Sequence, residues 1–127
     1  MDLLKDKENI YRLIKPKDLY IKNNKVKISS AAFVDPKGLS VEIQQGRQDR
    51  VVEAHLKIFF RGKISKTVKI STDVCDKFNI NIYNDNSPNK FHRLLLDFAK
   101  AFDENGDNSL SDDQAFELAK NCKDLVY

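Results

Sequence analysis

Apolar and polar residues alternate over several short stretches of this chain, which is the pattern of strands that bury one face. Turn-forming residues bound these stretches, among them Pro16, the pair Asn23-Asn24 and the run Asp35-Pro36-Lys37-Gly38. We therefore expect short strands at residues 10–14, 26–28, 39–43, 67–71 and 80–83.

Other segments repeat their apolar residues at helical spacing. Val52, Leu56 and Phe59 predict a helix from Asp49, as its N-cap, to about residue 60, with Gly62 ending it. Shorter helical segments are expected at 16–20 and 72–78. In the C-terminal third, an apolar face predicts one helix and Ser111 is the expected cap of another; that face comprises Phe91, Leu94, Leu95, Phe98 and Phe102.

These elements predict an α+β fold in which residues 1–127 form a single domain. We expect a small mixed sheet of short strands packed by helices, with a C-terminal helix-loop-helix. The chain has 127 residues, of which 41% are hydrophobic and 32% charged. A chain of this length and composition can bury a core without needing a disulfide or a metal.

The sequence also bounds where the protein works. It contains no apolar run near the roughly 20 residues that span a bilayer, and its first residues lack a signal-peptide core. We therefore expect a cytoplasmic protein without membrane contact. Cys75 and Cys122 stand far apart and form no CxxC pair, so both are expected to be reduced, structural thiols rather than zinc ligands.

The charge is distributed unevenly along the chain. Residues 97–127 hold 3 basic and 8 acidic residues, a net charge of −5, whereas residues 1–96 hold 19 basic and 11 acidic residues, a net charge of +8. The basic body suits an acidic protein or a nucleic acid. Lysine outnumbers arginine, the usual residue for bidentate phosphate recognition. This composition favours a solvated lysine-rich surface and a protein partner over a nucleic acid.

Residues 103–114 resemble the calcium loop of an EF-hand, in which alternate oxygen ligands surround the ion. The candidate ligands are Asp103, Asn105, Asp107, the carbonyl of Ser109, and Gln114 at position twelve. Glutamine cannot supply the bidentate carboxylate that completes such a site. Two interpretations remain: weak binding of Ca²⁺ by a single loop, or an acidic turn that leads to the helix capped by Ser111.

Four short motifs resemble those of a family of small bacterial proteins. They are Tyr11-Arg12, the segment 28–33, Leu39-Ser40-Val41, and the segment 86–92 that ends in His92. The family shows Y-R, S-x-A-F, L-S-V and N-P-x-H motifs in this order. The resemblance covers residues 10–96 and implies no activity.

Arg12, Ser29 and His92 permit two interpretations. In the structural one, Arg12 donates hydrogen bonds to carbonyls of residues 29–33, Ser29 organises a local turn, and His92 caps a helix or bridges two segments. In the other, the three residues resemble the site of ADP-ribosyltransferase-like folds. Arg12 would then hold a phosphate of NAD or a nucleotide, and Ser29 would fix the geometry of the site. His92 would face the ribose or act as a base, and Glu42 or Glu53 would supply the glutamate such folds use.

The sequence favours a non-enzymatic accessory or protein-interaction module of a bacterial cell. No phosphate-binding glycine motif and no nucleophile elbow occurs. His55 is expected at the surface or boundary of its helix. The alternatives are the weak Ca²⁺-binding domain and the small NAD- or nucleotide-binding protein. Apart from Ca²⁺ in the first alternative, we expect no cofactor.

Overall fold

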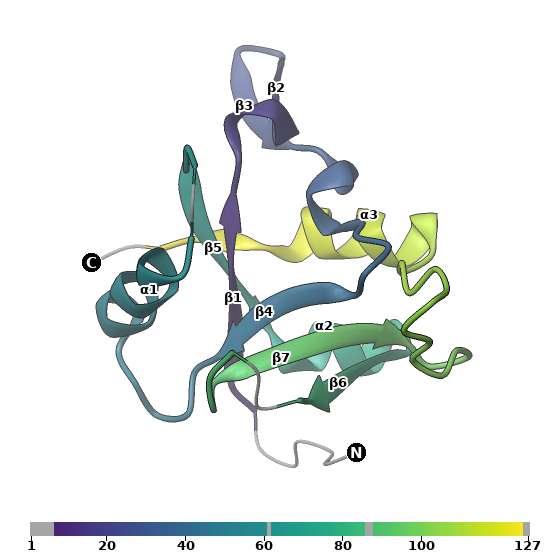
Figure 1. Cartoon of the computed structure of the whole chain (residues 1–127). Coiled ribbons are helices and arrows are strands. Elements are labelled where there is room, and N and C mark those ends of the chain that lie inside the picture. The colour runs from purple at the N-terminus through teal and green to yellow at the C-terminus, as the bar shows by residue number, and fades with distance from the viewer. Residues whose placement is uncertain (1–6, 61, 86–87, 126–127) are drawn as a thin grey trace.

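The computed structural model of the protein describes residues 7–60, 62–85 and 88–125, and shows a six-stranded antiparallel sheet with a separate hairpin (Figure 1). The strand order is β6-β7-β4-β1-β5-β8. The strands are β1 (Asn9–Ile14), β4 (Leu39–Ile43), β5 (Lys66–Ser71), β6 (Ile80–Asn84), β7 (His92–Asp97) and β8 (Lys123–Asp124). Every pairing is antiparallel, so the prediction of a mixed sheet was wrong: alternation reveals a buried face, but not the direction of the neighbouring strand.

The two faces of the sheet are covered differently. The α-helices are α1 (Asp49–Ile58), α2 (Thr72–Lys77) and α3 (Asp112–Asn121), and two short 3₁₀ helices are η1 (Pro16–Asp18) and η2 (Ser30–Phe33). The apolar core joins β1, β4 and β5 to η2, α2 and α3, with Ile10, Val41, Val68, Phe33, Cys75 and Leu118 among its buried members. Tyr11, Glu42 and Lys69 lie between core residues along their strands, and their side chains contact α1 on the opposite face.

Most of the predicted strands and the helices at α1, α2 and α3 are confirmed, with shifted ends for α1. The helical segment predicted at 16–20 is η1 followed by the start of β2. Helix α1 starts at Asp49, but its N-cap is Gln48, and it ends at Ile58, before Gly62. Ser111 caps α3 as predicted, in a capping box with Gln114. No helix in the described part of the chain is long and apolar enough to cross a bilayer.

The predicted C-terminal helix-loop-helix was wrong. Residues 92–97 form β7, which pairs with both β4 and β6. Its Leu94-Leu95-Leu96 run is apolar on both sides of the strand, so periodicity cannot distinguish it from part of a helix. Phe98 and Phe102, assigned to the buried face of that helix, are 70% and 45% exposed.

Strands β2 (Leu19–Lys22) and β3 (Lys25–Ile28) form a hairpin that stands out from the sheet (Figure 1). Its turn is formed by Asn23 and Asn24, whose φ angles of 53° and 61° fit the primed turns of two-residue hairpins. Leu19 and Ile28 pack against the core at its base. The hairpin is therefore anchored at one end and open to solvent at the other.

Candidate functional site

Arg12 lies where two strands of the sheet separate. β1 pairs with β5 along its whole length, but with β4 only at Ile10 and Tyr11. Beyond this point the Arg12 guanidinium occupies the opening, where Nε donates to the carbonyl of Ala32 at 2.8 Å and Nη1 to that of Ser40 at 2.7 Å. The predicted bond to the 29–33 segment is thus confirmed. Arg12 supplies donors that a longer β1–β4 ladder would otherwise supply.

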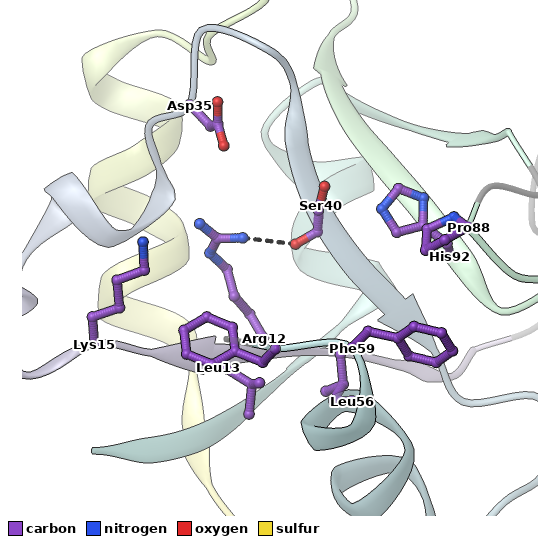
Figure 2. A pocket seen from close by; sticks show the side chains of 10 residues that line it. Arg12, Leu13, Lys15, Asp35, Ser40, Leu56, Phe59, Pro88 and His92 are labelled. Carbon is purple, nitrogen blue, oxygen red and sulfur yellow. Dashed lines mark hydrogen bonds between the residues drawn. The ribbon is translucent and has the colours of Figure 1, made fainter. Parts of the chain in front are cut away.

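The opening forms a cleft of about 360 Å³ beside Arg12 (Figure 2). Its polar lining comes from Arg12, Lys15, Asp35, Ser40 and His92, and its apolar wall from Leu13, Leu56, Phe59, Phe60 and Pro88. Burial lowers the pKa of Arg12, while Asp35 and Asp18 raise it. Because a guanidinium keeps its proton at neutral pH, the cleft has a fixed cation at its base.

His92 reaches the same cleft, but Ser29 does not. The Nδ1 atom of His92 lies 2.8 Å from Oδ1 of Asp85, so the histidine bridges two segments, as one interpretation predicted. It caps no helix, because β7 begins there. The Ser29 hydroxyl caps η2 through the amide of Ala31 and does not line the cleft. The three residues of the nucleotide-binding hypothesis therefore do not assemble into one described site.

A buried ionic cluster lies between the sheet and α1, and sequence reasoning missed it. Glu42 is only 2% exposed. The Nδ1 atom of His55 lies 2.7 Å from its Oε1 atom, and Nη1 of Arg47 lies 3.0 Å from its Oε2 atom. His55 thus lies on α1 at the boundary between the buried and the exposed side of the helix, as predicted. Glu42, a candidate for the glutamate of an NAD site, is already paired beneath the helix. The other candidate, Glu53, lies on α1 with Lys57 3.8 Å away.

Arg47 also ties the loop before α1 to the end of β4. Its Nη2 donates to the carbonyl of Ile43 at 2.6 Å and its Nε to that of Gln44 at 3.0 Å. The guanidinium carbon lies 3.5 Å from the centroid of the Phe91 ring. The alternation of β4 could have placed Glu42 on the face opposite the core, but Arg47 and His55 reach it only through the folding of α1 and of the loop before it.

A second cluster under α1 joins Tyr11, Asp49 and Lys69. The Tyr11 hydroxyl donates to Oδ1 of Asp49 at 2.6 Å, and Nζ of Lys69 donates to Oδ2 at 2.8 Å. Burial raises the pKa of Tyr11, and the Asp49 carboxylate raises it further. Burial alone would raise the pKa of Asp49, but the bonds from Lys69 and Tyr11 outweigh it and leave that pKa below its ordinary value. Asp49 therefore acts as the anionic anchor of α1.

This arrangement predicts a pH-dependent loss of stability. Because the Asp49 pKa is lower in the folded state, its contribution is complete above the ordinary value of 3.8 and is lost as the pH falls through the folded pKa. Asp49→Asn should therefore be less stable than the parent at pH 6.5, and the difference should shrink below about pH 4. Urea denaturation of both proteins at pH 6.5, 4 and 2.5 measures this difference in stability. A difference that stays constant with pH would contradict the role of Asp49 as an ionised anchor.

The candidate calcium residues are occupied by contacts within the loop and with nearby segments of the chain. The carboxylates of Asp103 and Asp107 each accept from the amide two residues on, at 3.0 and 2.9 Å. The Nζ atom of Lys100 lies 3.4 Å from the Ser109 carbonyl. Gln114 closes the capping box and donates to the carbonyls of Phe78 and Asn79 at 3.2 and 3.1 Å. Asn105 supplies the amide bonded by Asp103.

The loop thus has the contacts of an acidic turn leading into α3. A cluster of three or more His, Cys, Asp or Glu side chains able to hold a metal is absent from residues 7–60, 62–85 and 88–125. Instead of an entering helix, strand β7 precedes the loop and ends at Asp97. Asn108, 4% exposed, holds the loop by bonding both the amide and the carbonyl of Asp103 at 2.8 Å.

A groove of about 500 Å³ runs between the hairpin and α3. Its cations are Lys22 and Lys27 from the hairpin and Lys120 from α3; the remaining lining residues are Tyr20, Ile28, Ser29, Ser30, Phe116 and Ala119. None of these lining residues is acidic. Tyr20 and Phe116, at 47% and 57% exposed, place aromatic rings at its surface. Sequence analysis missed this groove, because its two sides are nearly a hundred residues apart.

The cysteines offer no reactive centre at neutral pH. Both are free, Cys75 in the core and Cys122 half-buried. Burial raises the pKa of Cys75 to about 12 and that of Cys122 to about 11. The thiols therefore stay protonated, and the thiolate is the reactive form.

Comparison of the chain with protein-family models, curated proteins and solved structures gives no match.

Proposed function

We propose that this protein is a non-enzymatic protein-interaction module of a bacterial cell that binds an acidic segment of a partner protein. The groove between the hairpin and α3 is the observation that carries the proposal. It combines the ammonium groups of Lys22, Lys27 and Lys120 with two exposed aromatic rings, and its lining contributes no carboxylate. A complementary negative segment would be attracted at long range and oriented on contact.

The chemistry of the groove favours a protein over a nucleic acid. Its three cations are all lysines, which act as point charges and suit carboxylates without requiring the planar fork of arginine. Tyrosine and phenylalanine are enriched where proteins meet, because they bury large areas with few rotatable bonds.

Site-specific photo-crosslinking in cells of the source organism tests this proposal. Phe116 in the groove and Phe98 outside it are both exposed, so each position can accommodate the larger aromatic side chain of benzoylphenylalanine. We expect the probe at 116 to capture one defined protein, through a peptide rich in Asp and Glu, and the probe at 98 not to capture it. Lys27→Glu should abolish the crosslink, while Lys57→Glu on α1 should leave it.

Three results would overturn the proposal. The first is a crosslinked product at 116 that nuclease digests, since this would identify a nucleic acid as the partner. The second is the same set of products from 98 and 116, since this would mean non-specific contact. The third is capture that is unaffected by Lys27→Glu, since the charge of the groove would then have no role.

A further inference from the structure

We propose that the cleft beside Arg12 binds an organic monoanion, a carboxylate carried on an apolar body. This inference is independent of the groove between the hairpin and α3, because the two sites share no lining residue. Arg12 uses Nε and Nη1 for its two carbonyl bonds. Its Nη2 amino group, on the side of Lys15 and Asp35 in Figure 2, makes no hydrogen bond within the described residues.

The fixed charges of the cleft select the charge of the ligand. Arg12 and Lys15 are cations and Asp35 is an anion, so these three lining groups sum to one positive charge. Asp18, outside the lining, adds a further negative charge that acts on Arg12 and also disfavours a dianion. The Nδ1 atom of the lining residue His92 lies 2.8 Å from the Asp85 carboxylate, so this pair brings no net positive charge to the cleft. One carboxylate would neutralise this set, whereas a phosphate dianion would exceed it and meet the Asp35 carboxylate. The cleft therefore suits a carboxylate better than a nucleotide phosphate.

The apolar wall defines the rest of the ligand. Leu13, Leu56, Phe59 and Phe60 supply the apolar part of the lining. A cavity of roughly 150 Å³ is enough to hold benzene, and this cleft has a volume of about 360 Å³. A phenyl ring or a branched alkyl chain would therefore fit, with its carboxylate at Nη2 of Arg12 and Nζ of Lys15. A carboxylate attached to an apolar group occurs both in a small aromatic acid and in an apolar residue at the C-terminus of a peptide.

Titration of isotopically labelled protein with four probes tests the inference. The probes are 3-phenylpropanoate, its neutral amide, phenyl phosphate and N-acetylphenylalanine. We expect 3-phenylpropanoate to bind with a Kd on the order of millimolar, typical for a ligand of this size. The amide signals of Arg12, Ser40 and Phe59 should shift with it. The neutral amide and phenyl phosphate should each bind at least about ten-fold more weakly, because one lacks the charge and the other exceeds it.

Two matched variants link the binding to the cleft. Lys15→Gln should raise the Kd for 3-phenylpropanoate about five- to ten-fold. Lys27→Gln, in the groove beside the hairpin, should leave this Kd unchanged. Tighter binding of N-acetylphenylalanine would identify a peptide end as the natural source, and weaker binding would identify a free acid. The inference is overturned by equal affinity for acid and amide, by tighter binding of phenyl phosphate, or by no shift at 20-fold the expected millimolar Kd.

Discussion

Glu42→Gln should lower the free energy of unfolding by about 3 kcal/mol, the largest effect we expect from a single substitution in this protein. The replacement keeps the size of the side chain and removes its charge. Glu42 is 2% exposed, and Arg47 and His55 lie 3.0 and 2.7 Å from its two oxygens. Without the carboxylate, the guanidinium of Arg47 would remain largely desolvated beside a neutral amide. Removing one member of a buried pair is costly for this reason.

Urea denaturation followed by circular dichroism measures this effect, with Asp124→Asn as the matched control. Asp124 also accepts from a cation, Nζ of Lys66 at 3.1 Å, but its side chain is 63% exposed. Solvent screening leaves such a surface pair worth about 0.5 kcal/mol. If the two variants unfold at the same urea concentration, the Glu42 cluster contributes no more than a surface ion pair, and the account of how α1 is held would be wrong.

Strands and helix caps could be predicted where local residues determine them. Residues 39–43 alternate because β4 buries one face in the core, and Ser111 begins α3 because its hydroxyl bonds an amide of the first turn. β7 could not be predicted, since its three consecutive leucines lack the alternation that marks a strand. The direction of the strands also depends on pairings that a single segment does not encode.

The candidate sites depend on contacts between distant segments, and this limits what the sequence can reveal. Arg12 could be singled out, because an arginine among apolar residues needs acceptors. The opening beside it could not, since it exists only because β4 stops pairing with β1 beyond Tyr11. The groove likewise requires α3 to pack beside the hairpin. Each site thus appears only when the topology is known.

The two faces of the sheet are stabilised in different ways. One face buries apolar side chains against η2, α2 and α3. The other holds α1 mainly through ions, and only Val52 of this helix is buried. An element held by ion pairs is sensitive to charge and pH in a way that an apolar core is not. Because Leu56 and Phe59 line the cleft, the position of α1 also determines the shape of that site.

Arg12→Ala should lower the free energy of unfolding by about 1–3 kcal/mol. The carbonyls of Ala32 and Ser40 would lose their donors at the point where β1 and β4 separate. The bond to Ala32 is partly buried, which limits replacement by water, whereas the bond to Ser40 is exposed. Arg12→Lys should recover only part of this loss, because a single ammonium lacks the fork that donates to both carbonyls. Urea denaturation of the three proteins gives this order directly.

Lys15→Ala provides the control, since it removes a cation from the same cleft without removing a carbonyl bond. The only contact of its Nζ in the described structure is with the Phe60 ring, 6.0 Å from the centroid. Its substitution should change stability by less than about 0.5 kcal/mol. Equal stability of Arg12→Ala and Lys15→Ala would show that water satisfies the two carbonyls. Arg12 would then add nothing measurable to stability, and the structural interpretation of its two carbonyl bonds would be wrong.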